Sequence, residues 1–202
     1  MTDFHSCLIE PGDPPSKREI LACALRLFVR DGLCETGIRA IGEAAGYTNP
    51  ALYKFFASKE ALTLYLFERC YGWVYQRLEA GSRAERFDAG LAGVVRAWVE
   101  LMEEQPDAVL YVNETLRELW PRARPATRRR SLLRLLRSLV EQGQAEGVVP
   151  RGVAPELGVA LLVGTLGQVA RQLALGDFKQ GPRALEAQLG ALLRGALTGG
   201  RP

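Results

Sequence analysis

The chain has 202 residues, of which 48% are hydrophobic and 24% are charged, and its formal net charge is +3. This composition is typical of a soluble globular protein that is long enough to bury a sizeable core. The excess of positive charge is too small to indicate a nucleic-acid partner by itself, so such a function has to rest on where the charges are placed.

Start and stop signals in the first part of the chain predict a loose tail followed by three short helices. Residues 1–15 hold three prolines and a glycine, which favours a loose tail. Ser16 and Glu19 have the spacing of a capping box at the start of a first helix. Thr36 can cap a second helix, and Thr48 can cap a third. The expected helices span residues 16–32, 36–45 and 48–56.

Six longer helices are expected in the rest of the chain, with breaks at prolines and glycines. They span residues 58–81, 88–105, 106–120, 125–147, 154–175 and 182–197. No stretch of useful length alternates with the period of two that marks a strand. The sequence therefore predicts an all-α fold of about nine helices.

The chain shows no pattern of metal ligands, because it has one histidine and its four cysteines form no CxxC pair. We expect no metal and no other cofactor, and free thiols in a reducing cytoplasm. The N-terminus lacks the basic and apolar stretches of a signal peptide. The longest uncharged apolar run, residues 157–170, is shorter than the ~20 residues that cross a membrane, so we interpret it as a buried helix. The expected protein is cytoplasmic and has no membrane partner.

The second and third expected helices, which Gly46 separates, have the arrangement of a helix-turn-helix. Glycine allows the sharp turn because it tolerates positive φ. Leu52 and Phe56 have the spacing of an inward face. The residues left on the outward side are Thr48, Asn49, Pro50, Tyr53 and Lys54. Such a short helix can lie in a major groove with its N-terminal residues against base edges.

This region resembles the TetR-type family of transcriptional regulators. The stretches "REILACALRLFVRDG" and "TGIRAIGEAAGYTNPALYKFFASKEAL" carry the resemblance, and they make up roughly a quarter of the chain. The resemblance implies a three-helix helix-turn-helix DNA-binding domain at residues 16–58. It also implies that residues 59–202 form a helical bundle that binds an effector and a partner subunit.

The resemblance also assigns roles to single residues. Phosphate contacts are implied for Thr36, Tyr53 and Lys59. Base and groove contacts are implied for Arg39, Thr48, Asn49, Pro50 and Lys54. Three residues depart from the family pattern: Gly37 stands where a hydroxyl residue is common, Gly42 where alanine is common, and Pro50 where glycine often lies. We expect Gly42 to cost the second helix about 1 kcal/mol and Pro50 to change the groove-facing surface.

A pocket for a small effector needs apolar walls with a few polar groups. The candidate lining residues are Trp98, Met102, Tyr111, Asn113 and Glu114. Residues of the first three types at such positions more often belong to the core than to a ligand pocket. Asn113 and Glu114 lie among them in the sequence and would supply the polar groups of the pocket.

The last two expected helices are rich in leucine and contain interior glycines, which are costly unless something packs closely. These helices are compatible with the core of a single chain. Together with the resemblance, they predict a subunit contact in which two helices from each chain form a four-helix bundle. The expected contact residues are Gly158, Leu162, Thr165, Leu189 and Leu193.

These patterns predict a cytoplasmic, homodimeric repressor that binds a near-palindromic double-stranded DNA operator and is released by an unknown small-molecule effector. Two other functions compete with this one. A helical-bundle enzyme would need a cluster of catalytic or metal-ligating groups, which the residues do not indicate, so we do not expect an enzyme. A ligand-binding or scaffold protein that keeps the helix-turn-helix only as structure would lack salt-dependent binding to a DNA duplex.

Overall fold

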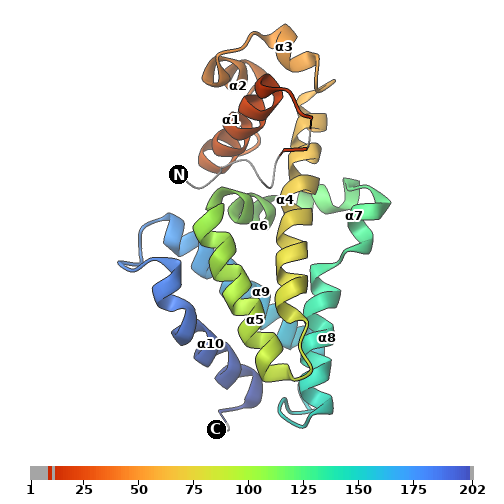
Figure 1. Cartoon of the computed structure of the whole chain (residues 1–202), viewed down its shortest axis with the longest axis vertical. Helices are drawn as coiled ribbons and strands as arrows, with labels where there is room; N and C mark the ends of the chain where they lie inside the picture. The colour runs from red at the N-terminus through yellow and green to blue at the C-terminus, as the bar shows by residue number, and fades with distance from the viewer. Residues whose placement is uncertain (1–8, 11, 201–202) are drawn as a thin grey trace. The chain divides into compact units, whose positions relative to one another are not determined.

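A computed structural model describes residues 9–10 and 12–200, and within that part of the chain every regular element is a helix (Figure 1). The elements are α1 (Pro15–Asp31), α2 (Ile38–Ala45), α3 (Asn49–Tyr53), α4 (Lys59–Ser82), α5 (Phe87–Glu104), α6 (Pro106–Leu119), the 3₁₀ helix η1 (Trp120–Arg122), α7 (Pro125–Arg129), α8 (Leu132–Ala145), α9 (Pro155–Ala174) and α10 (Pro182–Thr198). The prediction of an all-α fold is confirmed.

One expected helix, at residues 125–147, is divided into α7 and α8. Ser131 lies between them, and its hydroxyl accepts a hydrogen bond from the backbone N–H of Arg134 at 3.3 Å. A serine in this N-cap position satisfies one of the N–H groups that have no acceptor inside the new helix. The arginines before Ser131 have a high helix propensity, so the sequence did not indicate that the helix ends there.

The chain folds as two compact units, one made of residues up to 73 with 107–128 and the other of residues 74–106 with 129–202. Most of α6 belongs to the first unit. Tyr111 of α6 is buried there, with its ring stacked on Phe28 of α1 at a centroid distance of 6.0 Å. Its hydroxyl donates to the carbonyl of Thr63 on α4 at 3.0 Å. The helix-turn-helix therefore belongs to a larger unit than the expected domain of residues 16–58.

The first unit buries the inward faces of α1, α2 and α3 against the start of α4. The buried side chains include Ile20, Phe28, Ile41, Leu52 and Leu62. Phe56, just after α3, packs against Tyr65 of α4 with ring centroids 5.4 Å apart. These contacts hold α3 by its apolar side and leave its polar side outward.

A buried carboxylate ties α4 to the start of α7 in the same unit. Glu68 accepts a hydrogen bond from the backbone N–H of Arg124 at 2.6 Å and forms an ion pair with the Arg124 side chain at 2.5 Å. The Thr127 hydroxyl lies 3.2 Å from the same carboxylate. A buried charge needs this degree of compensation, and the Glu68 side chain is only 6% exposed.

The start of α1 differs from expectation, because its N-cap is Pro14, whose side chain has no hydrogen-bonding group. Glu19 instead accepts a hydrogen bond from the hydroxyl of Tyr47, so the expected capping box with Ser16 is wrong. The described part of the expected tail is held in place. Arg69 of α4 contacts Glu10 and the carbonyl of Ile9, at 3.1 Å and 3.0 Å. Residues 1–8 and 11 lie outside the described part of the chain.

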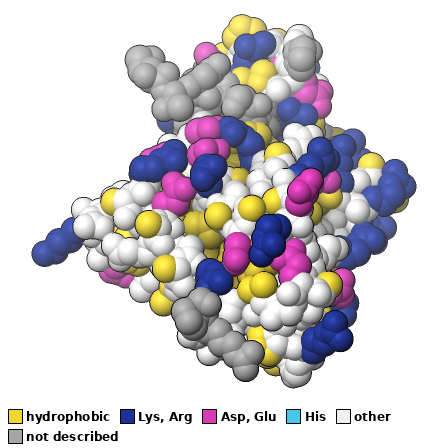
Figure 2. All heavy atoms as spheres, turned by 60° about the horizontal axis from the view of Figure 1, so that its bottom comes forward, with side chains coloured by type: hydrophobic (Ala, Val, Ile, Leu, Met, Phe, Trp, Pro, Cys, Tyr) yellow, Lys and Arg dark blue, Asp and Glu magenta, His cyan; other side chains and the backbone are white. Residues whose placement is uncertain are grey.

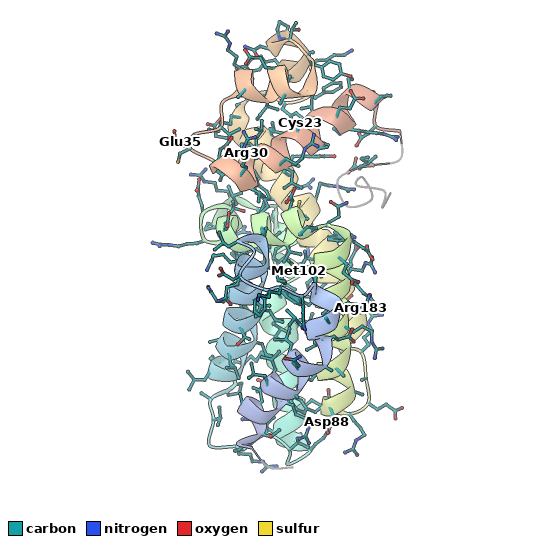
Figure 3. The ribbon with its side chains drawn as sticks, turned by 90° about the vertical axis from the view of Figure 1, so that its left-hand side faces the viewer. Cys23, Arg30, Glu35, Asp88, Met102 and Arg183 are labelled. Carbon is teal, nitrogen blue, oxygen red and sulfur yellow. The ribbon has the colours of Figure 1, made fainter. Side chains whose placement is uncertain are left out.

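In the second unit α5 runs antiparallel to α10, and ion pairs join both ends of the two helices. Arg183 pairs with Glu103 at 2.7 Å, and Arg194 pairs with Asp88 at 2.9 Å. Figure 3 shows Asp88 and Arg183 at opposite ends of this unit. Leucine and valine side chains from α5, α8, α9 and α10 fill the space between the helices.

Candidate nucleic-acid interface

The turn between α2 and α3 is closed by backbone hydrogen bonds around Gly46, whose φ of 74° favours glycine. The N–H of Tyr47 donates to the carbonyl of Gly42 at 2.8 Å. A Cβ on Gly42 would lie 2.8 Å from the carbonyl oxygen of Tyr47, which is too close for any side chain. Glycine at this position therefore has a structural reason that its helix propensity alone did not reveal.

α3 is a single short helix that begins after Thr48 and has Pro50 in its first turn, as expected. Thr48 occupies the N-cap position, but its side chain makes no capping hydrogen bond. It ends at Tyr53, three residues before the expected end, and a turn leads on to α4. Ser58 then accepts a hydrogen bond from the N–H of Ala61 at 3.2 Å, so it caps α4 as the sequence indicated.

Most of the predicted DNA-contacting side chains are exposed on α2, on α3 and in the turns beside them. The exposed residues are Arg39, Thr48, Asn49, Pro50, Tyr53 and Lys54. Figure 1 shows α2 and α3 at one end of the first unit and α6 at its other end. Tyr53 is 54% exposed, although Leu52 beside it is buried, so an aromatic ring and its hydroxyl face outward.

Two of the predicted cations have partners within the chain. Arg39 pairs with Glu43, four residues along α2, at 2.8 Å, and both side chains are well exposed. Exposed ion pairs of this kind are weak, so the Arg39 guanidinium can leave this carboxylate to contact a DNA groove. Lys59 is half-buried at the start of α4, where its Nζ lies 3.5 Å from the carbonyl of Cys34.

Thr36 does not fit the phosphate contact expected of it. Its side chain is buried, and its hydroxyl lies 2.8 Å from the carbonyl of Gly32 and 3.2 Å from that of Leu27. Thr36 is also not the cap of α2, because Gly37 occupies the N-cap position. Its role is to hold the chain between α1 and α2 in place, and we remove it from the DNA-contacting set.

Changing Thr36 to valine should therefore lower the free energy of unfolding by about 1–2 kcal/mol through loss of a buried hydrogen bond. The folded variant should bind DNA as well as the original protein. Urea denaturation and duplex binding, measured at one temperature, check both statements. Weakened DNA binding by a fully folded Thr36→Val variant would return Thr36 to the phosphate contacts.

The residues predicted to form an effector pocket are divided between the two units. Trp98 and Met102 are buried in the second unit, whereas Tyr111 is buried in the core of the first. Burial also raises the pKa of Tyr111 far above its usual value. Asn113 and Glu114 are exposed, because their positions on α6 fall on the side opposite to its buried face. Of the five, Met102 lines a cavity, which is formed at the end of α5.

The predicted subunit-contact residues lie mostly inside the chain. Leu162, Leu189 and Leu193 are buried, with exposed fractions of 0%, 6% and 1%. A Cβ on Gly158 would lie 3.0 Å from both methyl groups of Val140, so this glycine allows α9 to approach α8 of the same chain. Gly158, Leu162, Leu189 and Leu193 are core residues of the second unit, so the expectation that they face a partner is wrong. Thr165 is half-buried, and its place in a subunit contact stays a prediction.

The outer sides of the same helices are also apolar. Leu157 on α9 is 65% exposed and Leu192 on α10 is 63% exposed. α9 is long and apolar enough, by length and composition alone, to cross a membrane, yet only 28% of its most apolar window is buried. The interpretation of residues 157–170 as a buried helix is therefore wrong, because most of its residues are not buried in the single chain. Hydrophobic side chains also reach the surface on the face drawn in Figure 2, where charged side chains stand among them.

Comparisons with known proteins agree with this architecture. Residues 20–66 match the family model for bacterial regulatory proteins of the tetR family, and residues 82–171 match that for the tetracyclin repressor-like C-terminal domain. The chain is 28% identical over 161 residues to the HTH-type transcriptional repressor KstR2 of Mycolicibacterium smegmatis, a match that covers 75% of each protein.

Solved structures share the fold over nearly the whole chain. The ketosteroid transcriptional regulator KstR2 of Mycobacterium tuberculosis has a TM-score of 0.77 at 20% identity, covering 95% of this chain and 98% of its own. The regulator FadR of Bacillus subtilis, solved in complex with stearoyl-CoA, has a TM-score of 0.69 at 19% identity, covering 91% and 98%. At these identities the likeness shows the fold alone.

Proposed function

Because the chain belongs to the TetR family of bacterial regulatory proteins and is thus a DNA-binding transcriptional regulator, we propose that it is a homodimeric repressor. It binds a near-palindromic double-stranded operator and leaves the operator when a small effector binds. The observation that carries this proposal is a set of exposed polar, aromatic and cationic side chains on α2, on α3 and beside them, which can contact DNA. They lie on a helix-turn-helix whose apolar side is buried. Its M. smegmatis relative is itself a repressor, and as a DNA-binding regulator the protein is expected to work in the cytoplasm.

The contacts divide into two kinds, according to where the side chains lie. Tyr53 at the end of α3 and Lys59 at the start of α4 contact phosphates, since a helix start favours anions. The groove-facing residues are Arg39, Thr48, Asn49, Pro50 and Lys54. Of these, Asn49 is the first residue of α3, where recognition helices meet base edges.

Asn49→Ala should weaken binding to an operator by about 1–3 kcal/mol, through one or two base pairs, and leave binding to unrelated DNA unchanged. Tyr53→Phe should instead weaken both, because a phosphate contact carries no sequence information. Duplexes selected from random DNA provide the operator, and fluorescence anisotropy with selected and scrambled duplexes gives the affinities. Equal losses on both duplexes for Asn49→Ala would remove it from the base-reading residues.

The dimer forms, in this proposal, through the outer faces of α9 and α10 rather than through the buried faces named earlier. On α9 the outer face carries Leu157, Leu161 and Gly164. A Cβ on Gly164 would meet nothing within 4 Å in the part of the chain that the structure describes. A glycine inside a helix costs about 1 kcal/mol relative to alanine, and close approach by a second chain gives Gly164 a reason to be present.

A second chain also accounts for the apolar character of α9. Two helices from each subunit make a four-helix bundle with an isologous contact. Such a contact removes the exposed leucines of α9 and α10 from water. In a single soluble chain these leucines would stay in contact with water. A scaffold protein that keeps the helix-turn-helix only as structure would share the dimer but would show no salt-dependent DNA binding.

The effector in this proposal is a small molecule that binds the second unit. The structure of B. subtilis FadR was solved in complex with stearoyl-CoA, so a protein of this fold can hold a ligand with a long apolar part. An effector releases the operator only if it binds the DNA-incompatible arrangement of the dimer more tightly than the DNA-bound one. A ~100-fold preference corresponds to about 2.7 kcal/mol.

A further inference from the structure

A cavity of about 400 Å³ lies in the second unit, between the end of α5, the end of α9 and the loop that leads to α10. Its walls include Met102, Leu173, Phe178 and Pro182. Figure 3 shows Met102 beside the start of α10, where Arg183 lies. The volume is within the range of ligand pockets, which are typically ~300–1,000 Å³. It is roughly 13 times the ~30 Å³ that one water molecule occupies in the liquid, which leaves room for a small ligand of about a dozen non-hydrogen atoms.

The walls of this cavity are largely apolar, and the charged side chain among them is Lys179. Lys179 lies in the loop between α9 and α10 and is exposed, and it forms no ion pair within residues 9–10 and 12–200. The nearby Arg183 already pairs with Glu103 and Glu186 at 2.7 Å and 3.1 Å. Lys179 is therefore the cation left to meet a ligand at this cavity.

The start of α10 adds to the positive potential at the same place. Gly181, the N-cap residue, and Pro182, the first helical residue, both line the cavity, and α10 has 17 residues. The unpaired N–H groups and the dipole at a helix start favour an anion. Lys179 and the helix start therefore attract the same kind of ligand group.

An independent observation shows that this end of α5 is incompletely satisfied. Gln105 lies next to Pro106 in the chain, and Pro106 lines the cavity. The Gln105 side chain is 2% exposed, and its Oε1 has no hydrogen-bond partner among the residues that the structure describes. Buried polar atoms are seldom left without a partner. Gln105 is not one of the residues that line the cavity, so its unpaired oxygen lies beside the site and is not counted as a ligand contact.

We propose that this cavity binds an apolar carboxylic acid, whose tail lies between Met102, Leu173 and Phe178 and whose carboxylate meets Lys179 at the start of α10. The cavity walls come from α9 and α10, whose outer faces form the proposed dimer contact. Binding therefore changes how the two helices sit in the dimer, and it releases the operator. This regulatory step rests on the proposed function, whereas binding of the acid does not.

Calorimetric titration of DNA-free protein with dodecanoate, a twelve-carbon acid of suitable size, tests the site directly. The titration is kept below the concentration at which dodecanoate aggregates. We expect saturable binding that is at least 10-fold weaker in Lys179→Ala. Arg151→Ala removes one exposed positive charge of the same unit outside the cavity, and it should bind like the original protein. 1-Dodecanol, which has the tail without the charge, should bind at least 10-fold more weakly than dodecanoate.

A second variant tests the cavity itself. Ala174→Trp places a large side chain where Ala174, an exposed lining residue, now leaves space. This variant should keep its helix content by circular dichroism and lose dodecanoate binding. Two results would overturn the site. One is that dodecanoate does not bind the original protein. The other is that Lys179→Ala and Ala174→Trp each bind dodecanoate as tightly as the original protein does.

Release of a selected operator by dodecanoate tests the regulatory step separately. We expect the original protein and Arg151→Ala to release the operator at similar dodecanoate concentrations, and Lys179→Ala to release it only at a concentration at least 10-fold higher. Dodecanoate that binds without releasing the operator would overturn the regulatory step. A protein that binds dodecanoate but no duplex would instead overturn the proposed function and leave the acid site standing.

Discussion

Changing Leu157 and Leu192 together to glutamate is expected to turn the dimer into a folded monomer and to abolish operator binding. Both side chains are more than half exposed in the single chain, at 65% and 63%, so charges there leave the fold intact. Between two subunits the same charges would be buried without partners, at a cost of several kcal/mol (about 3–5 for a charge left unpaired). Operator binding fails because a monomer has one recognition helix, which contacts too few base pairs.

Sedimentation equilibrium at micromolar concentration measures the assembly, and circular dichroism measures the fold. Leu133→Glu is a matched control, since Leu133 is 53% exposed on α8, away from the proposed contact. This control should stay dimeric and bind the operator. A double variant that is still dimeric would show that the subunit contact lies elsewhere. An original protein that is monomeric at this concentration would show that the chain does not form the proposed dimer.

Gly93→Ala is expected to destabilise the protein strongly, by about 2–3 kcal/mol, because it overfills a close crossing of two backbones. A Cβ on Gly93 of α5 would collide with the carbonyl oxygen of Gly81 on α4, and a Cβ on Gly81 would collide with that of Gly93. The obstacle is backbone on both sides, so no side chain can rotate away to make room.

Urea denaturation compares this variant with Gly72→Ala on α4. A Cβ on Gly72 would meet nothing within 4 Å among the described residues. Gly72→Ala should therefore gain up to about 1 kcal/mol from helix propensity. The two changes are chemically identical and should have opposite signs. A Gly93→Ala variant as stable as the original protein would show that α4 and α5 do not approach each other as closely as described.

The sequence predicted the helices well, because glycines and prolines mark most of their ends. It predicted the helix-turn-helix for the same reason, since Gly46, Thr48 and Pro50 have strong local preferences. Break signals fail where a good helix former hides them, as at Ser131. Local patterns also misplace polar residues, because the buried hydroxyl of Thr36 bonds to carbonyls four and nine residues earlier in the chain.

The functional surfaces beyond the DNA-contacting residues were harder to predict. α9 and α10 are apolar on two sides, so the spacing of their leucines cannot tell which side meets the core and which side is exposed. Leu189 and Leu192 illustrate this, since they are three residues apart and are 6% and 63% exposed. The α5 end of the cavity had a sequence signal in Met102, but Lys179 comes from a distant loop that only the fold brings near.

Titration of a selected near-palindromic duplex at several salt concentrations is the most direct test of an operator-binding dimer. The account predicts a complex of two chains for each duplex. It also predicts that the logarithm of the affinity falls linearly with the logarithm of the salt concentration, because phosphate contacts release counterions. A complex of one chain for each duplex, or an affinity that does not change with salt, would contradict it.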